Sequence, residues 1–246
     1  MLRFASMVLV LNLAGTVSPP RRAVTKAAAV PRRTVAILEF DNHTGNAEYD
    51  ALGKGIASMM ISDLSVVKEI QLLERERVRD LIQEVDRQQT KYFDASTAVR
   101  VGRMVGAQYI VTGAFAALRP NMRIDTRVVR VETGEIVKTA QVTGDQDRFF
   151  ELEQALAAKL IDGLGLTLSA AERRRLAAQQ KGNRVNALET MEHLGFALDS
   201  YDKGDFNAAL SHMRTVVNGA PRSKFIRAMQ ARIQARAAGG ATPPHP

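Results

Sequence analysis

The chain contains no cysteine and no tryptophan, and only 5% of its 246 residues are aromatic. The absence of cysteine excludes disulfide bonds, thiol redox chemistry and cysteine-ligated metal sites. It also excludes the N-terminal lipid that bacterial lipoproteins carry on a cysteine. We therefore expect a protein that is not a lipoprotein and that holds its fold without covalent cross-links.

Histidine is scarce as well, with four residues at His43, His193, His212 and His245. No two of them have the spacing of metal ligands in a helix or turn. His43 follows Asp41 and is the one weak candidate for acid–base work, although a solvated loop histidine explains it more simply. No Gly-x-Ser-x-Gly elbow occurs, and the carboxylates are interspersed with bases, so no acid with a raised pKa is predicted. We predict no catalytic, cofactor-binding or metal-binding residues, and a protein that is not an enzyme.

A glycine-rich stretch after the first apolar run raises the question of a phosphate site. Gly53-Lys54-Gly55 follows a loop, and a helical pattern begins there. A P-loop needs Gly-x-x-x-x-Gly-Lys-[Ser/Thr], but Glu48 stands at the first glycine position and Gly55 replaces the hydroxyl residue. The motif fails at two positions, and Glu48 would repel phosphate. We expect these glycines to allow close packing of the first helical turn instead.

The formal net charge of +8 and the pI near 10.0 are concentrated at the N-terminus. Residues 1–33 hold six basic residues and no acid, so the rest of the chain carries only +2. In that remainder the charges alternate in sign, as in Glu74–Asp80 (ERERVRD). A solvated surface of mixed charge explains this pattern better than nucleic-acid binding does.

The N-terminus has the layout of a secretory signal. A basic start at residues 1–3 precedes an apolar run at 4–14, which residues 15–20 break. The run is too short to span a bilayer as a mature helix. We assign residues 1–33 to a signal peptide and linker; an uncleaved, disordered extension is the alternative.

The next segment predicts an α/β domain at residues 34–166. Strands are expected at 34–41, 70–73, 107–115, 122–131 and 136–144, and helices at 49–67, 74–89 and 147–164. A further helix is expected after Asp94, which can act as its N-cap. The alternation in 122–131 predicts a half-exposed antiparallel strand, and Gly134 suits the following hairpin turn. The fold class is α/β, a mixed sheet flanked by helices with an antiparallel C-terminal meander.

The C-terminal third predicts helices only. Ser169 and Glu172 form a capping-box pattern that opens a connecting helix at 167–183. Residues 184–236 resemble a tetratricopeptide-like helical unit, with two helices across 201–206 and a third from about 222. Residues 237–246 read as a disordered tail. A single repeat cannot bury its own faces, so this unit either caps the first domain or binds a partner.

Several stretches resemble one known family. Residues 35–64 resemble the first strand and helix of CsgG-like domains, the curli-secretion and assembly family, and residues 72–84 resemble the second strand and helix. Residues 96–115 and the hairpin at 127–137 are similar to later parts of the same domain, so the likeness covers about 34–165. The resemblance implies an exported, non-enzymatic domain that is periplasmic or associated with the outer membrane.

Pore-forming members of the family are lipoproteins that insert transmembrane hairpins into this domain. The present chain lacks the cysteine, and its connections at 116–121 and 145–147 are too short for hairpins of about twenty residues. We therefore predict an accessory or assembly scaffold for an outer-membrane or surface-appendage system. A subunit of an outer-membrane secretion channel for curli-like subunits is the alternative, and a nucleotide-binding regulator is the second alternative.

The partners expected from this interpretation are proteins of the cell envelope, including a second copy of the chain. Peripheral association with the outer membrane is compatible with it, whereas a nucleic-acid partner and a cofactor are not expected. Candidate contact residues lie on a charged helix face at Arg75, Arg79 and Arg87 and on a strand face at Arg123 and Arg127.

Overall fold

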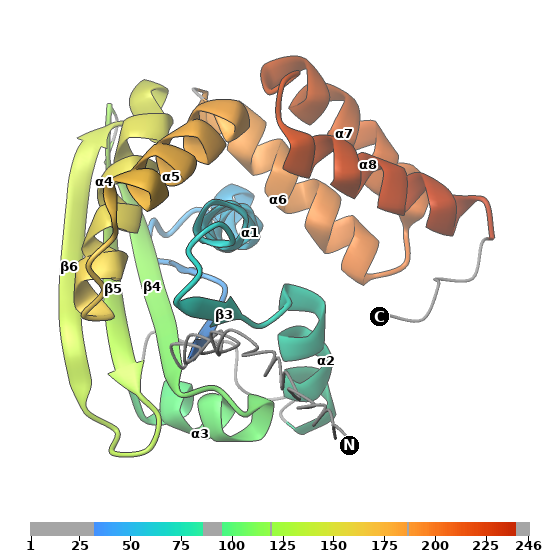
Figure 1. The fold of residues 1–246 in the computed structure, drawn as a ribbon. Coiled ribbons are helices and arrows are strands. Elements are labelled where there is room, and N and C mark those ends of the chain that lie inside the picture. The colour runs from blue at the N-terminus through green and yellow to red at the C-terminus, as the bar shows by residue number, and fades with distance from the viewer. Residues whose placement is uncertain (1–31, 86–94, 119, 186, 240–246) are drawn as a thin grey trace, which may run out of the picture. The chain divides into compact units, whose positions relative to one another are not determined.

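The computed structural model describes residues 32–85, 95–118, 120–185 and 187–239 (Figure 1). These residues belong to one compact unit that spans Pro31–Pro246. The predicted signal sequence, the Asp94 cap, Arg87 and the last seven residues of the predicted tail lie outside the described residues.

A six-stranded mixed sheet forms the centre of the α/β part. Its strands are β1 (Arg33–Ile37), β2 (Asp41–Asn42), β3 (Ile70–Leu72), β4 (Tyr109–Leu118), β5 (Asn121–Arg130) and β6 (Ile136–Asp145). The order is β3-β1-β4-β5-β6, and β2 pairs with β4 beyond the end of β1. Strands β3, β1 and β4 run parallel, whereas β5 and β6 form an antiparallel meander on β4. The predicted fold class is confirmed.

The meander is longer than the sequence suggested. Strand β4 pairs with β5 without a break from Tyr109 opposite Arg130 to Leu118 opposite Asn121. The prediction of a six-residue connection at 116–121 was therefore wrong, because residues 116–118 continue the ladder of β4 and Asn121 begins β5. Gly134 has a φ of 73° in the β5–β6 turn, as the hairpin prediction requires.

Helices cover both faces of the parallel half of the sheet and one face of the antiparallel meander. These helices are α1 (Leu52–Leu64), α2 (Arg75–Val85), α3 (Ala95–Val105) and α4 (Phe149–Gly163), with short 3-10 turns at Ala47–Tyr49 and Gln146–Arg148. Apolar side chains of α1 and α4 form a core with one sheet face, and those of α2 and α3 form a smaller core with the other face. Each large side chain buried there contributes about 1.5–3 kcal/mol to folding.

The C-terminal part is helical, as predicted. It consists of α5 (Ala170–Asn183), α6 (Leu188–Asp202), α7 (Phe206–Gly219) and α8 (Lys224–Ala237). The Ser169–Glu172 capping box is present at the start of α5. Apolar residues of α6, α7 and α8 join the same core as α1 and α4. The helical part therefore packs against the α/β part and does not stand alone.

None of the described helices is long and apolar enough to cross a membrane.

Candidate functional site

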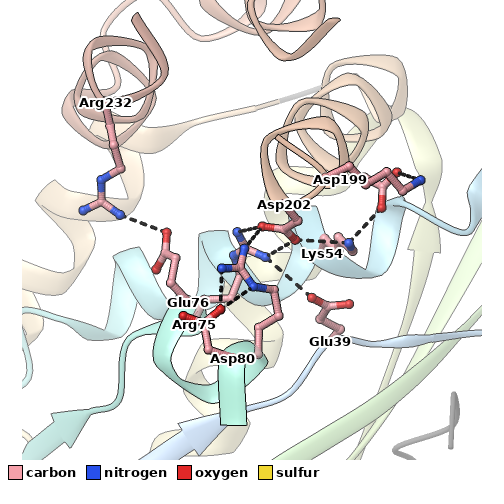
Figure 2. Close-up of polar contacts among 10 residues, drawn as sticks. Glu39, Lys54, Arg75, Glu76, Asp80, Asp199, Asp202 and Arg232 are labelled. Carbon is pink, nitrogen blue, oxygen red and sulfur yellow. Dashed lines mark hydrogen bonds and ion pairs between the residues drawn. The ribbon is translucent and has the colours of Figure 1, made fainter. Parts of the chain in front are cut away.

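Charged side chains from four segments meet where the α/β part contacts the helical part (Figure 2). We call this cluster the ionic junction. Its members are Glu39 just after β1, Lys54 in α1, Arg75 and Arg79 in α2, and Asp199 and Asp202 in the last turn of α6. Three cations therefore face three acids, and the cluster is balanced in formal charge.

Asp202 is the centre of the ionic junction, and its side chain is only 4% exposed. Arg75 holds it with two parallel bonds, since Nη1 donates to Oδ2 and Nη2 donates to Oδ1, both at 2.8 Å. Lys54 Nζ donates to Oδ2 at 3.1 Å, and Arg79 Nη1 donates to Oδ1. Burial alone would raise the pKa of Asp202, but the hydrogen bonds and charge of Arg75, with those of its other cations, hold that pKa below its usual range.

Two further acids complete the ionic junction. Lys54 Nζ donates to Asp199 Oδ1 at 2.8 Å. Glu39 lies 3.6 Å from Arg75 Nη1, and burial raises the pKa of Glu39 in spite of the nearby cations Lys54 and Arg75. Every cation of the cluster thus has an acid as its partner. The arrangement joins two parts of the fold and leaves none of these cations free to hold a phosphate.

Glycines bring the same elements close together. A Cβ on Gly195 of α6 would lie 2.0 Å from the carbonyl oxygen of Ala51, and one on Gly55 of α1 would lie 2.8 Å from the carbonyl oxygen of Met191. A Cβ on Gly53 would lie 1.9 Å from the carbonyl oxygen of Phe40. The prediction that Gly53 and Gly55 serve close packing is confirmed.

The predicted charged face of α2 requires a correction. Arg75 was expected to be exposed, but only 6% of its side chain is accessible, and Arg79 is 20% accessible. Both are directed to Asp202, which lies more than 120 residues further along the chain. The alternating charges of α2 gave no sign of this distant partner. Arg87 lies outside the described residues.

The predicted strand face remains accessible in part. Arg123 in β5 is 50% exposed and is paired with Asp125 two residues along the same strand, at 2.7 Å. Arg127 is half-buried on the same side of β5. Next to this face, β6 forms an edge of the sheet, and Ile136 at its start is 41% exposed. The β5–β6 surface is thus the accessible one of the two predicted contact faces.

A groove lies between β6 and α4. It has a volume of about 420 Å³ and is lined by residues 141–145 of β6 and by Arg148, Glu151, Leu152, Ala155 and Lys159 on the helix side. Its walls carry both apolar groups and charges of either sign. The edge strand and this groove together offer backbone and side-chain groups to a neighbouring protein.

A pair of buried acids lies at a different seam, between α1 and α4. Asp63 is fully buried and Glu153 is 3% exposed. Asn183 Nδ2 donates to Asp63 Oδ1 at 2.8 Å, but among the described residues Asp63 Oδ2 and Glu153 Oε1 have no hydrogen-bond partner. Burial raises the pKa of Asp63 to about 6, and burial together with the charge of Asp63 raises the pKa of Glu153 well above its usual value.

No sequence pattern was a ground for assigning a raised pKa to any acid, so sequence reasoning missed Asp63 and Glu153. Asp63 and Glu153 are nevertheless closed off from solvent, which leaves them no access to a substrate. Their surroundings tie helices together, because Asn183 of α5 also bonds to Ser62 Oγ at 2.9 Å and accepts a bond from Ser223 Oγ at 2.8 Å.

Two histidines that are far apart in the sequence also meet. His193 Nδ1 of α6 and His212 Nδ1 of α7 are 2.9 Å apart, and His212 stacks on Phe196. Burial and the charge of His193 lower the pKa of His212. The sequence spacing gave no indication of this contact. Within the described residues, no group of three or more histidines and acids is arranged to hold a metal ion.

Parts of this chain are similar to a family model and to known proteins. Residues 18–123 match the family model described as "Curli production assembly/transport component CsgG". Among curated proteins, 165 residues are 22% identical to "Putative adenylate cyclase 3" of Rhizobium meliloti (strain 1021); the match covers 66% of this chain and 26% of the relative. The chain thus spans only about a quarter of that protein.

Several solved structures are distantly similar to this chain. The LpoB C-terminal domain from Salmonella enterica has a TM-score of 0.40 at 16% identity, covering 49% of this chain and 87% of that one. Lipoprotein GNA1162 from Neisseria meningitidis has a TM-score of 0.40 at 10% identity, covering 55% and 99%. The PelC dodecamer from Paraburkholderia phytofirmans has a TM-score of 0.37 at 15% identity, covering 58% and 93%. These scores are too low to carry an argument about function.

Proposed function

We propose that this protein, which carries a CsgG-family domain in residues 18–123, is an exported, non-enzymatic protein of the cell envelope. It acts as an accessory or assembly scaffold for an outer-membrane or surface-appendage system, through contacts with other proteins. The family match is the observation that carries this proposal. The basic and apolar start of the chain, which has the layout of a secretory signal, supports export.

The state of the charged groups supports a role without catalysis. The cations of the ionic junction are neutralised by acids in the same cluster, and Asp63 and Glu153 are closed off from solvent. A catalytic acid or base must reach the reacting group of its substrate. These groups, whose pKa values are shifted, therefore serve the fold.

The surface that supports protein contacts is the β5–β6 surface. It combines the Arg123–Arg127 face of β5, the exposed Ile136 and the edge strand β6, on which no further strand pairs among the described residues; the groove beside α4 borders the same strand. Exposed sheet edges pair readily with a strand from another chain. The helical part is held on α1 by the ionic junction and the glycine contacts, so it supports the α/β part.

Fractionation of the native cells tests this proposal directly. We expect the protein in the periplasm or loosely attached to the outer membrane, with a mass below the 26.9 kDa of the full chain. Protein that resists salt and carbonate washing of the outer membrane would favour the secretion-channel alternative. Full-length protein in the cytoplasm would refute export and with it the envelope role.

Nucleotide binding is tested separately, because the name of the curated relative includes a cyclase and the match covers only 26% of that protein. We expect ATP, GTP and cyclic AMP to leave the melting temperature unchanged. A ligand at one hundred times its Kd would add about 2.7 kcal/mol to the free energy of unfolding. A clear rise in melting temperature with any of the three would favour the nucleotide-binding regulator over the scaffold.

A further inference from the structure

The two edges of the sheet differ in how they are protected against pairing with a further strand. At one edge, β3 has only three residues. At the other edge, β6 has ten residues, and no further strand pairs with it among the described residues (Figure 1). Natural sheets protect an edge by keeping its strand short or by placing prolines, bulges or charges in it. Because β6 is long, its protection would have to come from one of the last three.

The middle of β6 has neither a proline nor a bulge. Residues 136–145 contain no proline. The register shift in the β5–β6 pairing lies at Val128/Val129, opposite the start of β6, and the pairing is regular from Lys138 to Asp145. Backbone irregularity therefore protects only the first residues of this edge.

Charge protects the middle of β6 as little. Lys138 is the one cation of the strand, and its Nζ donates to Asp162 of α4 at 2.5 Å, so its charge is already paired. Asp145 is the one acid, and its side chain caps the turn that follows by accepting a bond from the backbone N–H of Asp147. The run 138–144 is thus a regular strand edge whose single charge is neutralised within the same chain.

The side chains of this run complement those of a second copy on the side away from α4. Two copies related by a twofold axis at Gln141 would pair antiparallel, so that Thr139 of each copy faces Thr143 of the other and Gln141 faces Gln141. All three side chains are exposed in the single chain. Uncharged polar pairs of this kind, threonine pairs above all, stabilise neighbouring strands.

The side chains that point to α4 are compatible with the same register. Ala140 of each copy would face Val142 of the other, and Lys138 would face Gly144. Gly144 has no side chain to obstruct the lysine, and no two like charges are opposed. The groove of about 420 Å³ beside α4 borders residues 141–145, so α4 leaves this part of the edge uncovered.

From these observations we infer that two copies of the chain associate through antiparallel pairing of residues 138–144 of β6, which joins their two sheets into one. A second copy is the partner because each residue of the run has a compatible residue of that copy opposite it, and because the run holds no free charge that would favour an oppositely charged strand. The inference rests on the proposed function, since it names the partner of the β5–β6 surface.

Light scattering of the full chain at increasing concentration tests the association. We expect the mass to rise from the 26.9 kDa of one chain to twice that value, with a Kd on the order of 10 μM because the interface is small. Gln141→Lys places two like charges opposite each other at the axis and should raise the Kd about fivefold. Thr133→Lys is the matched control, because Thr133 is exposed in the β5–β6 turn outside the paired run, and it should leave the Kd unchanged.

Single cysteines test the register, because the natural chain contains none. In Gln141→Cys the two cysteines would have Cβ atoms about 4.5–5.5 Å apart, close enough for oxidation to link the dimer by a disulfide. Thr139→Cys lies on the same exposed side, but its two copies would be more than about 13 Å apart, so it should not cross-link alone. A mixture of Thr139→Cys and Thr143→Cys should cross-link.

Two results would overturn the inference. One is the mass of a single chain at concentrations well above the expected Kd, in which case β6 pairs with a strand of another protein or with none. The other is cross-linking of Thr139→Cys alone as readily as Gln141→Cys. Cell fractionation, which tests the proposed function, reports location and not association. A monomer in the periplasm would therefore refute the dimer alone, whereas a dimer in the cytoplasm would refute the envelope role alone.

Discussion

Two buried aspartates at helix seams have pKa values that are shifted in opposite directions. Asp202 in the ionic junction has three cationic partners, and its pKa lies below the usual range. Asp63 at the α1–α4 seam has amide partners and the acid Glu153 as its neighbour, and its pKa is raised to about 6. Burial alone raises the pKa of both groups, so the charge of the neighbours decides the sign. The first site ties two parts of the fold together as ions, whereas in the second site the raised pKa values favour the protonated acids.

The largest expected effect comes from removing the acid at the centre of the ionic junction. Asp202→Ala leaves Arg75 buried without its two-bond partner, which should lower the free energy of unfolding by about 3–5 kcal/mol. Urea denaturation followed by circular dichroism measures the change. Asp80→Ala is the matched control, because Asp80 also pairs with Arg79 but is 64% exposed. The control should change stability by less than about 1 kcal/mol, and an equal loss in both variants would show that burial of the pair is unimportant.

The second effect tests whether the junction depends on close helix packing. Gly195→Ala would place a methyl group 2.0 Å from the carbonyl oxygen of Ala51, forcing α6 away from α1 and Asp202 away from Lys54. We expect a loss of about 1–3 kcal/mol in the free energy of unfolding. Gly182→Ala in α5 is the control, since no atom lies within 4 Å of its added Cβ, and it should gain up to about 1 kcal/mol. A Gly195→Ala variant as stable as wild type would refute the packing argument.

Some features of the fold could be predicted from the sequence. The strands, the Gly134 turn, the Ser169 cap and the role of Gly53 and Gly55 follow from local patterns, and the structure confirms them. Local patterns predict the strands, the turn and the cap because the residues that interact there lie within a few positions of one another. They predict the packing role of Gly53 and Gly55 because a glycine inside a helix is commonly kept for close contact with another element.

The two buried sites could not be predicted in the same way. Arg75 reads as a solvated residue in a charged helix until Asp202 is brought to it, and Asp63 looks like an ordinary helix acid until α4 covers it. One weak signal was present, because Asp199 and Asp202 are three residues apart and therefore share a helix face. Nothing local indicated which cations that face would meet.

The third effect is the pH dependence that the acid pair contributes to stability. The folded-state pKa values of Asp63 and Glu153 lie above their ordinary values of 3.8 and 4.5, so the folded protein binds more protons than the unfolded chain. Stability from this pair is fully present below about pH 4 and is lost progressively as the pH rises from there through the folded pKa values, which for Asp63 is about 6. The loss should be on the order of 2 kcal/mol.

Glu153→Gln isolates this contribution, because the amide cannot ionise. Chemical denaturation at pH 4.5 and pH 7.5 should show a variant similar to the wild type at the lower pH and more stable than it at the higher pH. Glu151→Gln on the same helix is the control, since Glu151 is 45% exposed, and it should keep the wild-type pH dependence. If Glu153→Gln also keeps the wild-type pH dependence of stability, the raised pKa of Glu153 is not its cause.

The smallest effect extends the comparison from charged groups to neutral ones, through two serines one turn apart on α1. Ser62 Oγ accepts a hydrogen bond from Asn183 Nδ2 at 2.9 Å, whereas Ser58 Oγ, in a residue that is also buried, has no partner among the described residues. Ser62→Ala should therefore lower the free energy of unfolding by about 1 kcal/mol, and Ser58→Ala should raise it by a similar amount because an unsatisfied hydroxyl is removed. Thermal melts of the two variants measured side by side give the sign. A loss of stability in both would mean that Ser58 Oγ has a hydrogen-bond partner in the folded protein.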